Sequence, residues 1–411
     1  MPLLCRLINC TEGGGMDSLS FGKVLQGLQP LAALSTPKEA IRQFTPNWFA
    51  TTMGTGILAL ALGQLPGNIP VLWQLGKIIW LLNILLFVVF IAMYTARWLM
   101  FFHEARQVFG HPTVSMFFGA IPMSLATVIN GLVQYGLPSW GDAVIPWAHA
   151  LWWLDVVMAM ACGVLIPFMM FTRQEHSIDQ MTAVWLLPVV AAEVAAASGG
   201  LIAQHLTHAS AQFNMLITSY VLWAYSVPVA LSILVILVLR LALHKLPHEN
   251  MAASIWLSLG PIGTGALGML LIGNDAPEIF ALHGLPGVGQ VAAGMGLIVG
   301  TLLWGFGLWW MLLAVLVTVR YAREGIPFNL GWWGFIFPLG VYAVTTLKLG
   351  AMLDMAFFDV LGVFFVVVLS AMWLVVASKT AQGAYRGNLF VSPCITGKAC
   401  ALALSTPGCS K

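Results

Sequence analysis

Residues 331–340 read GWWGFIFPLG, and the apolar chain continues as VYAVTTL to residue 347. Pro338 stands inside this run, directly after Phe337. A proline lacks the backbone N–H that an interior helix position donates, and its ring clashes with the carbonyl one turn earlier. The sequence therefore places a helix breaker, next to a large aromatic ring, within a segment apolar enough to lie in a membrane.

The composition indicates an integral membrane protein. Of 411 residues, 60% are hydrophobic and only 8% are charged, with a mean hydropathy of +0.90. Soluble domains carry about 25% charged residues, so a soluble fold of this length could not cover its surface. The net charge of +2 is too small to indicate a nucleic-acid partner.

The apolar runs are long and lack the alternation of β-barrel strands, so they predict membrane helices. A crossing helix needs about 20 apolar residues. On this basis we expect an all-α protein with ten spans, near 46–64, 73–101, 112–135, 145–171, 180–203, 212–240, 252–273, 286–317, 332–350 and 355–378.

The basic residues predict how these spans are oriented. Of the 17 Lys and Arg residues, only Lys77 and Lys348 fall on the side opposite to the tails. Basic residues collect in cytoplasmic loops, so we expect a multi-pass protein of the cell membrane with both termini in the cytoplasm. The predicted parts are an N-terminal tail (1–42, with Met16 as an alternative start), a transporter domain (43–379) and a C-terminal tail (380–411).

A proline recurs in every odd-numbered span, followed within about two turns by small or hydroxyl residues. The stretches are FTPNWFATTMGTG, GAIPMSLATVING, WLLPVVAAEVAAASGG, SLGPIGTGALG and FIFPLGVYAVTTL, with Pro46, Pro122, Pro188, Pro261 and Pro338. Broken helices are tolerated in membranes where they line a cavity inside the protein. We therefore predict that the odd spans form an inner, pore-lining ring, although prolines are also generally common in membrane helices.

The stretch FTPNWFATTMGTGI, followed by ten spans with WLLPVV in the fifth and WWGFIFPLG in the ninth, resembles the tellurite-resistance/dicarboxylate transporter family over residues 42–380. That family includes tellurite-resistance proteins, malate permeases, sulfite pumps and slow-type anion channels. The resemblance implies five helical hairpins in a quasi-fivefold arrangement around a central anion pore, a homotrimer, and a phenylalanine of the ninth helix that plugs the pore. Phe337 matches that position and Phe335 is the alternative; an ordinary packed core phenylalanine is the competing interpretation.

No ring of basic residues lies within the spans, so anion selectivity would depend on weaker donors and on helix ends. The candidates for the path share helix faces or follow the prolines. They are Asn47, Thr51 and Thr55 in the first span, Ser124 and Thr127 in the third, Thr264 in the seventh and Thr345 in the ninth. A hydroxyl in a membrane helix also commonly bonds its own backbone.

Two carboxyls fall within spans, Glu193 and Asp155. Ionisable groups inside a membrane are costly and suggest function. Desolvation should keep Glu193 neutral, so it is a candidate proton site of an anion–proton symporter; a structural hydrogen-bonded group is the competing interpretation. Asp155 belongs to an outer helix, where we expect a local partner.

Other functional classes find little support. GTGALG at 263–268 lacks the strand and the distant acid of a nucleotide site, and the six cysteines show no metal-binding spacing. We expect no metal, no cofactor and no enzymatic activity. The partners are small anions and the lipid bilayer. The resemblance places C4-dicarboxylates such as malate first, with sulfite efflux or general anion conduction (tellurite resistance included) as alternatives, and a channel or a proton-coupled carrier both remain open.

Overall fold

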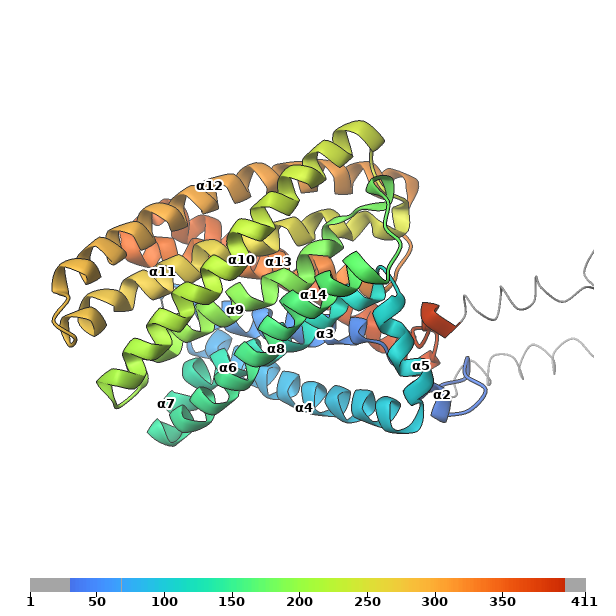
Figure 1. Cartoon of the computed structure of the whole chain (residues 1–411), viewed down its shortest axis with the longest axis horizontal. Helices are drawn as coiled ribbons and strands as arrows, with labels where there is room; N and C mark the ends of the chain where they lie inside the picture. Colours follow the sequence, from blue (N-terminus) through green and yellow to red (C-terminus); the bar gives the residue numbers. More distant parts are fainter. Residues whose placement is uncertain (1–29, 68, 396–411) are drawn as a thin grey trace, which may run out of the picture.

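The computed structural model describes residues 30–67 and 69–395. All regular elements in this part of the chain are helices, and the long ones lie together in one bundle with α4 along one edge and α12 along another (Figure 1). Within the described residues, eight helical segments are long and apolar enough to cross a membrane. The protein is thus an all-helical, multi-pass membrane protein. Predictions for residues 1–29 and 396–411, Met16 included, lie outside the described residues.

Five long helices form the periphery of the bundle. They are α4 (Pro70–Met100), α8 (Ile145–Thr172), α10 (Ala209–His244), α12 (Pro286–Glu324) and α14 (Ala356–Arg386). Only 28% of the most apolar window of α4, α12 and α14 is buried, and 33% of that of α10. Apolar side chains such as Phe171 (82% exposed) and Val71 (75% exposed) point away from the protein. Exposed apolar surface of this extent fits contact with lipid tails.

Five other helices lie inside. They are α3 (Phe49–Leu62), α6 (Ala120–Gly131), α9 (Leu187–Ile202), α11 (Leu259–Ala281) and α13 (Trp333–Leu353). Every residue of α3 is buried. The buried share of the most apolar window is 94% around α9, 89% around α11 and 78% around α13. Helices that are apolar on all sides and buried on all sides belong to the interior of a bundle.

The inner helices contact one another in a closed sequence: α3 contacts α6, α6 contacts α9, α9 contacts α11, α11 contacts α13, and α13 returns to α3. The next long helix in the chain packs on each of them, as α4 does on α3 and α14 does on α13. Glycines permit the close approach. A Cβ at Gly340 would lie 2.5 Å from a side-chain carbon of Ile57, and one at Gly56 would lie 2.1 Å from the Thr127 hydroxyl.

Each inner helix begins with a short 3₁₀ segment. These segments are η1 (Pro46–Trp48), η3 (Val114–Gly119), η7 (Ala183–Leu186), η9 (Glu249–Ser258) and η10 (Leu330–Trp332). Pro46 lies in η1. Pro122, Pro188 and Pro261 each lie in the first turn of an inner α-helix, where a backbone N–H would have no α-helical acceptor, so the lack of this N–H in proline costs no hydrogen bond. Only Pro338 lies farther inside its helix. Four of the five prolines thus mark the change from 3₁₀ to α geometry.

Charged side chains hold together the end of the bundle at which α5 (Phe102–Ala105) lies; Figure 1 shows the position of α5. Arg42, at the end of α2 (Lys38–Arg42), donates from Nε to Glu104 at 2.7 Å, and this bond lowers the pKa of the Glu104 carboxyl. Arg97 is fully buried and donates to the Phe44 carbonyl and, at 3.3 Å, to the Ser392 hydroxyl. The chain after α14 is therefore tied to the entrance of the first inner helix.

Candidate functional site

A cavity of about 110 Å³ lies where the N-terminal ends of the five inner helices meet; we call it the vestibule. Each inner segment contributes to its lining: Asn47 from η1, Phe117 from η3, Leu187 from α9, Leu257 from η9 and Gly334 from α13. A single water needs about 10–15 Å³ measured in this way. The vestibule can therefore hold several waters or a small solvated ion.

The electrostatics of the vestibule come from the backbone. None of the described residues that line it carries a charge. The N-terminal end of an α-helix carries a partial positive charge of about half a unit, together with N–H groups that lack intrahelical acceptors. Five such ends that converge on one cavity create a site that favours anions, without a fixed cation that would hold them tightly.

The polar side chains of the vestibule are amides and hydroxyls. Asn47 has a buried Oδ1 that finds no hydrogen-bond partner among the described residues. Asn329 uses Oδ1 to accept the N–H of Gly331 at 2.7 Å and donates from Nδ2 to the Asn250 carbonyl at 3.1 Å. Ser254 also lines the cavity. Asn250, Ser254 and Asn329 were not among the residues predicted from the sequence, because they precede the prolines rather than follow them.

Most of the hydroxyls predicted for the path are engaged in contacts between helices. Thr55 accepts a hydrogen bond from Trp373 of α14 at 3.1 Å, and Thr127 accepts one from Asn83 of α4 at 3.1 Å. Both threonines thus face the outer helices. Because these bonds link inner to outer helices, they stabilise the bundle.

The remaining hydroxyls lie deeper among the inner helices. Ser124 donates to the Phe49 carbonyl at 2.8 Å, and Thr345 donates to the Gly263 carbonyl at 3.0 Å. Thr264 donates to the carbonyl of its own helix one turn earlier, at 2.8 Å. Thr51 is buried and its hydroxyl has no partner among the described residues, yet it does not line the vestibule. Asn47 is thus the one predicted path residue found in the vestibule lining.

Phe335 and Phe337 are both buried, at 2% and 3% exposure, but they lie on different faces of α13. The ring of Phe335 packs 6.0 Å from Trp256 and 5.8 Å from Trp332, and it lines a pocket formed with α12 and α14. Successive helix residues are rotated by about 100°, so Phe337 lies about 200° around the helix from Phe335. Phe337 also follows Gly334, which lines the vestibule, by one turn.

The two carboxyls that the sequence analysis placed within spans lie between helices. Glu193 of α9 is fully buried and accepts a hydrogen bond from Ser226 of α10 at 3.2 Å, and its second oxygen has no described partner. It does not line the vestibule. Asp155 of α8 is also fully buried, and neither oxygen has a hydrogen-bond partner among the described residues. The local partner expected for Asp155 is therefore not found there.

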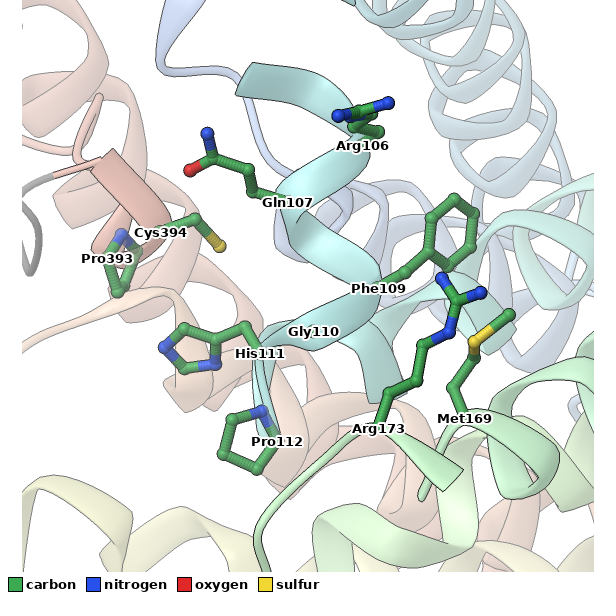
Figure 2. A pocket seen from close by; sticks show the side chains of 10 residues that line it. All are labelled: Arg106, Gln107, Phe109, Gly110, His111, Pro112, Met169, Arg173, Pro393 and Cys394. Atoms are coloured by element: carbon green, nitrogen blue, oxygen red, sulfur yellow. The ribbon is translucent and has the colours of Figure 1, made fainter. Parts of the chain in front are cut away.

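A larger pocket of about 690 Å³ lies outside the inner ring, beside η2 (Arg106–Gly110) (Figure 2). Arg106 and Arg173 contribute to its wall, as does His111. The Nδ1 atom of His111 accepts the N–H groups of Thr113 and Val114, both at 3.2 Å, at the start of η3. Burial lowers the pKa of His111, so the neutral ring that makes these bonds is favoured. His111 thus fixes the entry of the second inner segment, η3 and α6, from its outer side.

Known proteins match nearly the whole bundle. The profile of the voltage-dependent anion channel family matches residues 43–381. The sulfite efflux pump of Arthroderma otae is 38% identical over 353 residues, covering 85% of this chain and 93% of the relative. The sulfite efflux pump of Trichophyton rubrum is 37% identical over 353 residues, again covering 85% of this chain and 93% of the relative. The malic acid transport protein of Schizosaccharomyces pombe is 24% identical over 347 residues, covering 82% of this chain and 77% of the relative.

All five inner segments lie within the matched range, including the first, third and fifth, whose sequences suggested the resemblance. The names of these relatives are those of transporters and pumps rather than enzymes. This chain therefore belongs to the voltage-dependent anion channel family, which transports anions across membranes.

Proposed function

We propose that the protein exports small oxyanions from the cytoplasm through the axis of the inner ring, with sulfite as its first substrate. The observation that carries this proposal is the convergence of five helix N-termini on a vestibule without charged side chains. Such a site attracts anions by dipoles and N–H groups and lets them leave again.

The proposal includes ten crossings in a quasi-fivefold arrangement. The helical segment Val114–Thr172 holds both α6 and α8, which would cross the membrane in opposite directions. η1 and α3 together cover Pro46–Leu62, a length of about 27 Å from the rise of the two helix types, close to a hydrocarbon core of about 30 Å. The closed series of contacts among the five inner helices supports a common axis.

We propose Phe337 as the gate of this axis. Thr346 of the same helix accepts a hydrogen bond from Trp304 of the outer helix α12 at 2.9 Å. Nine residues separate Phe337 from Thr346, so the two side chains point in opposite directions, about 180° apart. Since Thr346 faces outward, Phe337 faces the axis one turn beyond the vestibule, where an apolar ring would close a water-filled path.

The relatives favour sulfite over malate. Relatives named sulfite efflux pumps reach 38% identity, whereas the one named for malic acid reaches 24%. The absence of a charged side chain among the described vestibule residues also suits a small anion better than an extended dianion, which would need two charge-bearing sites. The predicted order of substrates is therefore reversed in this proposal.

We propose the orientation of the vestibule from the basic residues, and outward transport from the relatives named sulfite efflux pumps. The N-terminal ends of the inner helices lie at the same end of the bundle as Arg42, Arg97 and Arg173, so we propose that the vestibule opens to the cytoplasm and that both termini lie there. The cell membrane and a homotrimer remain proposals that rest on the family resemblance.

Flux measurements in proteoliposomes test this function. Vesicles loaded with sulfite, malate or chloride are placed under an imposed potential, and release is compared with that from protein-free vesicles. We expect sulfite to leave fastest, with a rate that follows the potential. Faster release of malate would restore the dicarboxylate assignment, and release equal to that of protein-free vesicles for all three anions would refute anion transport.

A further inference from the structure

Two charged residues occupy the far ends of the inner helices, where the proposed function has assigned nothing. Asp275 lies near the end of α11 and is 6% exposed, and Lys348 lies near the end of α13 and is partly buried. Lys348 is one of only two basic residues expected on the side opposite to the tails. A cation so placed is costly in a membrane and suggests a function.

Lys348 shares a helix face with Phe337. Eleven residues separate them, which is about three turns and about 16 Å along α13, with an angular difference of only about 20°. The opposite face of α13 is occupied at this depth, since a Cβ at Gly350 would lie 2.3 Å from the carboxylate of Asp359 in α14. Thr346, bonded to α12, likewise points outward. Lys348 is thereby directed toward the axis.

Asp275 lies on the corresponding face of α11. The outer helix α12 packs against its neighbours in the chain: a Cβ at Gly273 would lie 2.9 Å from Gly296, and one at Gly289 would lie 2.8 Å from the Ala276 carbonyl. Asp275 is rotated by about 160° from Gly273, so it points away from α12. Asn274 donates to Oδ1 of Asp275 at 3.0 Å, and Oδ2 is buried without a described partner.

The charges of Asp275 and Lys348 interact, yet no hydrogen bond or ion pair holds the Lys348 ammonium within the described part of the chain. The ammonium is therefore free to bind another anion. Its position also offsets a repulsion: the C-terminal ends of the five inner helices carry partial negative charge, which disfavours an anion that leaves there.

We propose that Lys348 is the anion-binding residue of the outer exit, and that Asp275 competes for its ammonium so that a small oxyanion is released. This inference rests on the proposed function, because it takes the inner axis as the path. An anion that passes Phe337 then meets a positive charge that offsets part of the negative charge of the five helix ends. Asp275 keeps the binding weak, as conduction requires.

The test measures sulfite flux against concentration for Lys348→Gln, Lys348→Arg and Asp275→Asn. We expect Lys348→Gln to raise the half-saturating concentration about tenfold, the effect of one charge-assisted bond, and Lys348→Arg to restore it. Asp275→Asn should lower that concentration and the maximal rate together, because release slows. Lys77→Gln is the matched control, since Lys77 bonds to Ser139 at 2.8 Å on the outer helix α4. Equal kinetics for Lys348→Gln and Lys77→Gln would overturn the inference.

A second measurement does not depend on transport. In vesicles, Lys348→Cys should react rapidly with an anionic methanethiosulfonate added outside, beyond the background of the native chain, and sulfite should slow the reaction. If the thiol does not react in a protein with normal flux, residue 348 does not face the path; the inference about Lys348 is then wrong, whereas the proposed function still stands. Absence of flux from the native chain would instead refute the proposed function itself.

Discussion

Phe337→Ala separates a gate from an ordinary packed ring, because α13 carries its own control. Phe335 is the same residue type on the same helix, equally buried, but on the outward face against Trp256 and Trp332. If the ring of Phe337 blocks the path along the axis of the inner helices, its removal opens a water-filled path. We expect anion conductance to rise at least tenfold, which corresponds to a barrier lower by about 1.4 kcal/mol.

The two variants should rank in the opposite order for stability: Phe335→Ala should lose more than Phe337→Ala. Removing a packed phenylalanine costs about 3–5 kcal/mol in a protein core, and Phe335 also loses two aromatic contacts worth about 0.5–1.5 kcal/mol each. Phe335→Ala should therefore lower the unfolding temperature in detergent more than Phe337→Ala, by the equivalent of about 1–3 kcal/mol. Its anion conductance should remain within twofold of the native value.

The assay is potential-driven anion flux in proteoliposomes, with thermal unfolding of the same preparations. Conductance that rises equally in both variants would mean that loosened packing causes a leak. Native conductance in Phe337→Ala, with a large loss of stability, would make Phe337 a packing residue. Either result would refute the gate.

The remaining predictions concern the frame around the axis. Thr127→Val should leave flux within twofold but destabilise the protein by about 1 kcal/mol in thermal unfolding, because Asn83 of α4 loses its acceptor. Arg97→Gln should expose the chain after α14 to limited proteolysis, because the Phe44 carbonyl and the C-terminal segment lose a shared donor. The pKa of His111 is lowered in the folded protein, so its contribution to stability is present above pH 6.5, the ordinary value, and is lost as pH falls. His111→Asn, which keeps a capping acceptor, should remove at most about 1.4 kcal/mol per pH unit of that dependence; an unchanged pH profile of thermal unfolding would contradict this role.

The regular part of the fold is predictable because it is local. Each odd apolar run contains a proline, and the structure places all five of these helices inside; in four of them the proline marks the helix entry, whereas Pro338 lies farther inside α13. Glycine content alone does not separate inner from outer helices, because the outer helix α12 also packs closely through glycines such as Gly296. The change from 3₁₀ to α geometry at the prolines was not predicted, because a short 3₁₀ turn and the first turn of an α-helix have the same sequence requirements.

The roles of individual polar residues could not be predicted in this way. Thr51 and Thr55 lie one turn apart on one face, but whether that face meets water or a tryptophan depends on α14, more than 300 residues later in the chain. Glu193 finds its hydrogen-bond donor on the next helix for the same reason. Asn250 and Asn329 were overlooked because they lie in the entry segments, where a helical period is too short to be recognised.

An anion path without a ring of basic residues requires an electrostatic potential that varies little along the axis. Five helix N-termini of about half a charge each give the vestibule roughly two and a half positive charges, partly screened by water and salt. The same dipoles make the opposite mouth equally negative, so an anion attracted at one end would be repelled at the other. In the proposed mechanism, Lys348 at that end offsets part of this difference, and Asp275 keeps the bound anion from being held too tightly. In the same proposed mechanism, Phe337 then controls passage by excluding water from this path.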